Sequence, residues 1–112
     1  MFDALKNLGN LPGLMAKAQE MQAKMKQVQE EMGHKQVSAD AGGGMVEATV
    51  NGRMELVKIR IDKARVDVND TEMIEDLVVA AVNAAQVKAA AMARAEMQRV
   101  TSEMGLPPGM LP

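Results

Sequence analysis

Apolar and polar positions recur along this chain with two different periods. Between Leu14 and Met32 the apolar positions recur every three or four residues, which is the heptad spacing of an amphipathic helix. The spacing predicts a helix over 14–33, with Gly33 as its C-terminal stop. A narrow seam flanked by Lys, Glu and Gln suits packing against one partner helix. The seam consists of Leu14, Ala18, Met21, Met25, Val28 and Met32.

In the middle of the chain the period changes to two. Apolar and polar side chains alternate over 46–51 and again over 57–62, which is typical of strands with one wet face. Asn51-Gly52 between them favours a tight hairpin turn, because both residues tolerate positive φ. A shorter strand near 36–40 is expected to join through a turn of three glycines. We therefore predict a three-stranded antiparallel sheet within 34–62.

The last long element is a second helix. Asn69 and Glu72 form a plausible capping pair at its start, and no helix breaker follows until Gly105. The pattern predicts a helix over 70–103, about 50 Å long at 1.5 Å per residue. Its first half carries a wide apolar stripe suited to covering the sheet. The part from Lys88 onward is rich in Ala with few large side chains, so the sequence does not decide whether the helix is broken.

Both ends of the chain are predicted to lie outside these elements. Residues 1–13 are expected to be a helical or irregular lead-in punctuated by Pro12-Gly13, and the Pro/Gly-rich tail 105–112 is expected to be mobile. The whole chain, 1–112, is expected to form a single α+β domain. A domain of this length is about 26–30 Å across, so part of a 50 Å helix must project. Unmatched helix surface and open sheet edges predict a homodimer.

Composition excludes several kinds of chemistry. The 112 residues include 12 Met, one Phe and no Trp, Tyr or Cys. Disulfides, thiolate catalysis and Cys-ligated metals are therefore impossible, and aromatic platforms for single-stranded bases are absent. The single His34 cannot supply a multi-histidine site, and no Asp/Glu spacing resembles an EF-hand. We predict a protein that is not an enzyme, with no cofactor, no metal and no small-molecule substrate.

The charge of the chain limits the kinds of molecule that it can bind. The net charge is −2, and the isoelectric point of 5.4 lies below the value of about 9 typical of basic nucleic-acid binders. A polyanion would therefore have to meet locally basic faces. No basic leader or apolar run of roughly 20 residues is present, which predicts a cytoplasmic protein without a membrane segment. The segment charges are +1 over 1–35, −2 over 36–52, +3 over 53–65, −5 over 66–82 and +1 over 83–112.

Several stretches of the sequence carry a resemblance to a known family. They run from the helix beginning at Gly13-Leu14-Met15, through the strands 44–52 and 57–62, to the segment 75–85 and the tail 105–110. In this order and spacing they resemble the YbaB/EbfC family of bacterial nucleoid-associated proteins. The resemblance implies an α-β-β-β-α subunit in a tweezer-like cytoplasmic homodimer, with helical arms projecting from a central sheet region. It also implies DNA binding, association with the nucleoid and a role in nucleoid organisation and gene regulation.

Contacts to DNA phosphates need Lys or Arg on accessible faces. The candidates fall into two sets. The set of second choice lies on or beside the sheet: Arg53, Lys58 and Arg60. After Arg53 the chain reads Met54-Glu55-Leu56, where family members often carry a polar or basic hairpin segment. The first candidates are the basic residues on the two predicted helices: Lys17, Lys24, Lys26, Lys88, Arg94 and Arg99.

Two functions from different classes stay open on the residues alone. The first is a homodimer that binds double-stranded DNA, mainly through phosphates and with little sequence specificity. The second is a dimeric interaction or chaperone-like scaffold whose Met-rich helical arms bind protein partners. Adaptable Met side chains and the acidic isoelectric point favour the second. The family resemblance decides for the first.

Overall fold

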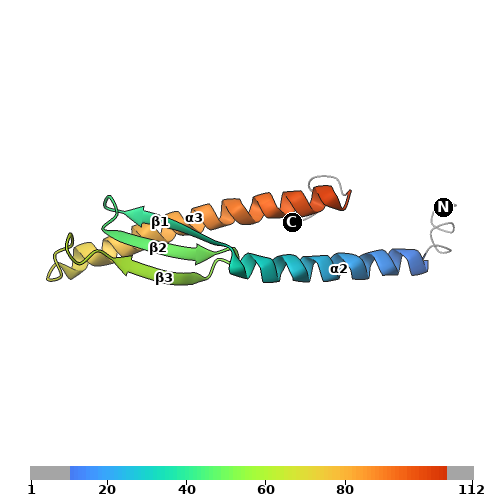
Figure 1. The fold of residues 1–112 in the computed structure, drawn as a ribbon, viewed down its shortest axis with the longest axis horizontal. Coiled ribbons are helices and arrows are strands. Elements are labelled where there is room, and N and C mark those ends of the chain that lie inside the picture. The colour runs from blue at the N-terminus through green and yellow to red at the C-terminus, as the bar shows by residue number, and fades with distance from the viewer. Residues whose placement is uncertain (1–10, 106–112) are drawn as a thin grey trace. The chain divides into compact units, whose positions relative to one another are not determined.

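A computed structural model of the chain describes residues 11–105. It contains a helix, three strands and a second helix, which confirms the predicted α-β-β-β-α order (Figure 1). Within the described part of the chain, residues 11–31 and residues 32–105 belong to two compact units. The elements are α2 (Leu11–His34), β1 (Gln36–Ala41), β2 (Val46–Asn51), β3 (Leu56–Ile61) and α3 (Thr71–Glu103).

The helix α2 begins earlier than predicted. It starts at Leu11, so Pro12-Gly13 lies in its first turn and does not precede the helix. Proline is tolerated there because the first backbone N–H groups of a helix have no intrahelical acceptor. Leu14 and Met15 are 52% and 59% exposed, whereas Met21 is half-buried. Residues 1–10 of the predicted lead-in and 106–112 of the predicted tail lie outside the described part of the chain.

The three strands form one antiparallel sheet in the order β1-β2-β3, as predicted. Residues directly opposite each other share a face, so the register sorts the side chains into two sets. One face is apolar and includes the rows Ala39–Ala48–Ile59 and Ala41–Val46–Ile61. The other face is polar and carries the rows Ser38–Thr49–Lys58 and Asp40–Glu47–Arg60.

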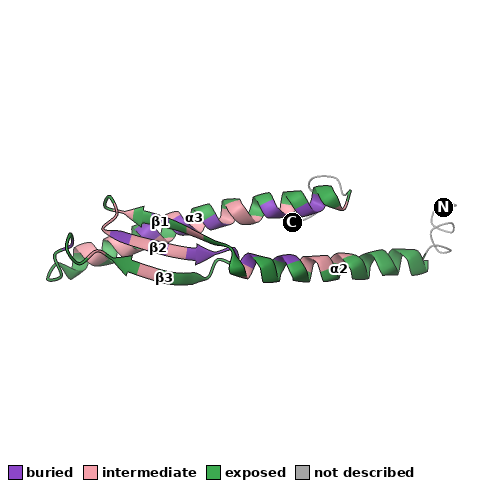
Figure 2. Ribbon diagram, in the orientation of Figure 1, coloured by how far each residue is buried: buried purple, intermediate pink, exposed green. Residues whose placement is uncertain are grey.

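The core lies between α3 and the apolar faces of β1 and β2 (Figure 2). Ala81, Ala85 and Ala89 recur every four residues along α3 and are fully buried. Their small side chains let the helix approach the sheet closely. The strands contribute Ala39, Val46, Ala48 and Val50 to the same cluster.

The helix α3 is continuous over its 33 residues. Its N-cap is Asp70, whose Oδ1 accepts a hydrogen bond from the Met73 N–H at 3.2 Å, so the predicted Asn69 cap is wrong by one residue. By length and composition alone α3 could cross a membrane. Three of its alanines, Ala81, Ala85 and Ala89, are buried against the sheet, whereas most of its apolar stretch is exposed or half-buried.

The strand β3 differs from its neighbours because α3 packs over β1 and β2. A β-bulge between Thr49 and Val50 adds one residue on the β3 side. The alternation of the sequence predicts a half-buried β3. In the structure three of its four apolar residues are exposed, and only Ile59 packs against the core. We call the four apolar residues the β3 strip: Leu56 at 49% exposure, Val57 at 48%, the half-buried Ile59, and Ile61 at 36%.

The β2–β3 connection is longer than the predicted two-residue turn. It spans 52–55, and its positive φ, 68°, falls on Met54. The Asn51 side-chain oxygen accepts hydrogen bonds from the backbone N–H groups of Arg53 and Glu55, at 2.9 and 3.0 Å. The Gly52 N–H donates to the Met32 carbonyl at 2.9 Å, and a Cβ on Gly52 would lie 2.7 Å from that oxygen. Glycine is therefore required here by the close approach of the helix end.

Candidate nucleic-acid interface

The polar face of the sheet brings Lys58 and Arg60 together, as the alternation predicts. Arg60 Nε lies 3.7 Å from Glu47 Oε1, and Asp40 stands in the same row. Lys58 stands in a row with two hydroxyl groups that bond to each other at 2.8 Å. Two cations and two carboxylates therefore share this face. Its positive potential is correspondingly weak.

Contacts within the chain explain the presence of a cation at Arg53. Its guanidinium lies directly against Gly33, at the C-terminal end of α2, where a cation complements the negative end of the helix dipole. Its Nε also lies 4.0 Å from Glu55 Oε1. A phosphate at Arg53 would have to compete with both interactions.

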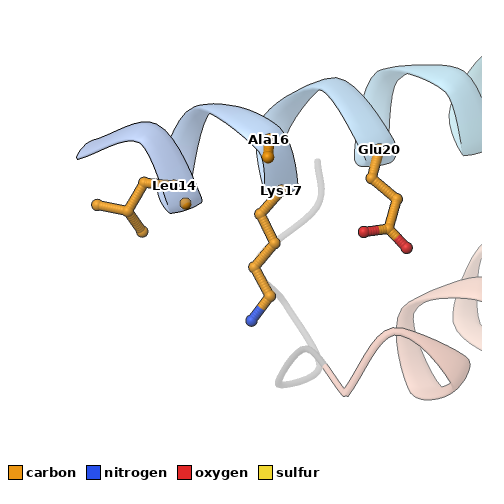
Figure 3. Close-up of a pocket in the computed structure, with 5 residues that line it drawn as sticks. Leu14, Ala16, Lys17 and Glu20 are labelled. Atoms are coloured by element: carbon orange, nitrogen blue, oxygen red, sulfur yellow. The ribbon is translucent and has the colours of Figure 1, made fainter. Parts of the chain in front are cut away.

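The three candidate lysines of α2 have no partner within residues 11–105. Neither an ion pair nor a side-chain hydrogen bond engages Lys17, Lys24 or Lys26 in that part of the chain. Lys17 and Lys24 are seven residues apart, so they lie on one flank of the helix. Figure 3 shows Leu14, Lys17 and Glu20 projecting to the same side of α2, where with Gly13 and Ala16 they line a shallow pocket. The ammonium group of Lys17 thus stands at an open, mixed surface.

On α3 the candidates occupy different environments. Lys88 Nζ donates a hydrogen bond at 3.0 Å to the backbone oxygen of Ser38, on the edge strand β1. A lysine in this position blocks part of a strand edge from pairing with another chain. Arg94 is exposed, and within residues 11–105 it has neither an ion pair nor a side-chain hydrogen bond. The six helical candidates are therefore divided between two helices, three on α2 and three on α3.

Arg99 belongs to a network centred on Glu96. Glu96 is only 8% exposed and accepts hydrogen bonds from Arg99 Nη2 and, at 3.2 Å, from Lys35 Nζ. These hydrogen bonds, with that of Arg99 the stronger, hold the pKa of the Glu96 carboxyl at about 2, against 4.5 ordinarily. Arg99 Nη1 also donates to Glu103 at 2.6 Å, and its pKa is raised, chiefly by Glu96. A phosphate would have to share Arg99 with two carboxylates or displace them.

Sequence reasoning missed Glu96. Its spacing to Arg99 is visible in the sequence as an i,i+3 pair, but Lys35 lies 61 residues away and only the fold brings it close. Within the described residues no group of three His, Asp or Glu side chains could hold a metal ion. The candidate site thus consists of cations on α2, on α3 and on the sheet.

Comparison with known proteins identifies the family. The YbaB/EbfC DNA-binding family model matches residues 7–104. The chain is 47% identical over 100 residues to a nucleoid-associated protein of Moorella thermoacetica, covering 89% of this chain and 96% of that one. It is 46% identical over 101 residues to a nucleoid-associated protein of Granulibacter bethesdensis, covering 90% and 94%.

A solved structure shows a similar fold. The crystal structure of an uncharacterized protein from Helicobacter pylori superimposes with a TM-score of 0.66 at 22% identity, covering 84% of this chain and 95% of that one. At this identity the likeness concerns the fold alone. It is consistent with the α-β-β-β-α order described above.

Proposed function

Because the chain belongs to the YbaB/EbfC DNA-binding family, we propose that it binds double-stranded DNA as a homodimer in the bacterial nucleoid. The observation that carries the proposal is the family match over nearly the whole chain. Named relatives from several bacteria, called nucleoid-associated proteins, support the location in the cytoplasm. Contacts are mainly to phosphates, which carry no base information, so sequence specificity is low. Nucleoid organisation and gene regulation follow from such binding.

The β3 strip supports the homodimer. Half-exposed large apolar side chains along one strand are costly to leave in water, and a second copy can cover them. Edge-to-edge pairing of β3 with itself is disfavoured by charge. Two antiparallel registers pair most of β3 and keep the two strips on one face. One of them puts Lys58 opposite Lys58 of the second copy, and the other puts Lys58 opposite Arg60 of the second copy. We therefore propose that the two copies pack strip against strip.

The phosphate contacts are assigned first to the helical candidates. Lys17, Lys24, Lys26 and Arg94 can meet a phosphate without giving up an interaction within the described residues. Lys88 and Arg99 stay in the set, but each would have to share or leave its present acceptor. The second set, Arg53, Lys58 and Arg60, is the alternative surface, and carboxylates neighbour two of its three members.

One observation favours a second candidate function. Leu14 and Met15 are more than half exposed at the start of α2, and Met side chains adapt to varied surfaces. A scaffold that binds protein partners through its Met-rich helix would use this surface. Neither function requires catalysis, a cofactor, a metal or a membrane.

A gel shift with random-sequence duplex at low and moderate salt tests the proposal against this alternative. DNA binding predicts a tight complex whose affinity falls steeply with salt, because counterions are released from the phosphates. Binding only to an unfolded test protein, with no shift of the duplex at low salt, would contradict the proposal and support the scaffold. Duplexes of unrelated sequence should bind within a few-fold of each other.

A further inference from the structure

The side of α3 that faces away from the sheet carries an ordered pattern of its own. Val79 and Val87 are 60% and 71% exposed, although the helix buries smaller alanines on its opposite side. At 100° per residue, seven residues of α3 up to Arg94 lie within about 40° on either side of Asn83; nearer the C-terminus Met97 and Thr101 share this angle but are half-buried and buried. We call the seven residues the α3 outer stripe: Glu72, Asp76, Val79, Asn83, Val87, Ala90 and Arg94. All are exposed except the half-buried Ala90.

The α3 outer stripe is complementary to itself. Asn83 stands at its centre, and the two valines lie four residues to either side. Glu72 and Arg94 lie eleven residues to either side of Asn83, about 16 Å along the axis. Two such helices can lie antiparallel, related by a two-fold axis that passes beside Asn83. Glu72 of each copy is then level with Arg94 of the other copy. Each valine is then level with the other valine across the contact.

From this match we propose that the α3 outer stripe binds the same stripe of a second copy, in an antiparallel helix pair centred on Asn83. The interface is isologous, as two-fold contacts between identical chains are. Ala90 and Asn83 are small enough to let the two helices approach closely. This surface lies on the opposite side of α3 from the sheet. A dimer joined through the β3 strip can therefore use it to join a second dimer.

A charge swap tests the contact without DNA. Sedimentation velocity of the wild type should show a weight-average mass that rises with concentration from twice towards four times 12.0 kDa. Glu72→Arg and Arg94→Glu, each alone, replace two attractive pairs by two repulsive ones. Each should weaken association of dimers about tenfold. The double variant Glu72→Arg/Arg94→Glu restores both pairs with reversed sign, so it should associate as the wild type does.

Glu75→Arg is the matched control. Glu75 is also exposed in the first turns of α3, but it lies about 80° round the helix from Asn83 and meets no cation in the proposed pair. Its reversal changes the net charge equally and should leave association within about twofold of the wild type. Arg94→Glu lies far from the helix N-terminus, so it keeps the test valid if Glu72→Arg weakens the helix start.

Three results would overturn the proposal. They are a wild type that never exceeds a dimer, single variants that associate as the wild type does, and a double variant as weak as the singles. A failed gel shift would leave the proposal standing, because the sedimentation contains no DNA. Arg94 is also among the candidate phosphate contacts, so duplex binding by the variants is measured separately. Equal binding by the wild type and Arg94→Glu would assign the phosphate contacts to the other candidates and leave the DNA-binding proposal intact.

Discussion

Two neighbouring strands with the same alternating pattern have opposite environments. In β2 the apolar residues Val46, Ala48 and Val50 are fully buried. In β3 the side chains of the β3 strip are as large or larger, yet most of them face solvent. The alternation of a strand determines which side chains share a face. What covers that face depends on where α3 crosses the sheet.

The two strands therefore have different roles. The buried face of β2 stabilises the fold of one chain through the hydrophobic effect. The uncovered strip of β3 keeps apolar surface available for association. Substitutions of the same kind in the two strands should therefore change two different measured quantities, the free energy of unfolding and the association constant.

Val50→Asp should have the largest effect on folding. An unpaired carboxylate in the core between β2 and α3 should cost about 3–5 kcal/mol in the free energy of unfolding. Urea denaturation followed by circular dichroism measures it. A Val50→Asp chain with the wild-type midpoint would show that the core does not lie there.

Val57→Asp makes the same change on β3. The carboxylate stays in water, so the secondary structure should persist, while the association constant of the dimer should fall more than about a hundredfold. Light scattering after size exclusion should give a mass near 12.0 kDa. Thr49→Asp, on the polar face of the sheet, is the control and should remain dimeric. A dimeric Val57→Asp would place the interface elsewhere.

Glu96→Gln tests the part of the fold that lies on the α3 side of the sheet. Glu96, on α3, is linked there to Lys35, which lies just before β1. The folded pKa of about 2 is below the ordinary 4.5, so the ionised carboxylate stabilises the fold above pH 4.5. This contribution is lost as the pH falls from 4.5 towards 2. The melting temperature of the wild type should therefore fall more steeply over this range than that of Glu96→Gln. Parallel curves would show that the network does not stabilise the fold.

Met54→Gly should have the smallest effect, and a favourable one. A side chain at a φ of 68° costs about 1–2 kcal/mol, whereas glycine loses about 0.5–1 kcal/mol more backbone entropy on folding. The net gain in the free energy of unfolding should be about 0.5 kcal/mol, measured by urea denaturation. A loss of stability would mean that the Met54 side chain makes interactions that outweigh the strain.

Local pattern was enough to predict the element order, the sheet and its hairpins. It failed where distant residues decide the geometry. The Gly52 N–H in the turn after Asn51 donates to the carbonyls of Met32, in α2, and of Lys35, and the positive φ of the turn falls on Met54. Lys88 looks in the sequence like any exposed cation, yet the fold brings its ammonium to the edge of β1. No local spacing predicts that contact.

The family resemblance, carried by several motifs in order, predicted the class of function. Which cations contact DNA is a separate question, because a lysine without a protein partner has the same sequence signal whether it meets phosphate or water. Lys17 and Lys24 on α2, and Lys58 and Arg60 on the sheet, therefore remain two predicted surfaces. Substituting each pair on its own decides between them.

The most direct test of DNA binding is the slope of log K against log salt concentration on a random duplex. The wild type should show a steep negative slope, and Lys17→Ala/Lys24→Ala should reduce its magnitude by roughly 0.9 for each phosphate that is no longer neutralised. Lys58→Ala/Arg60→Ala, which also removes two charges, should leave the slope unchanged. A reduced slope in the sheet variant alone would contradict the assignment to the helices. Negligible binding by the wild type at low salt would contradict the DNA-binding account itself.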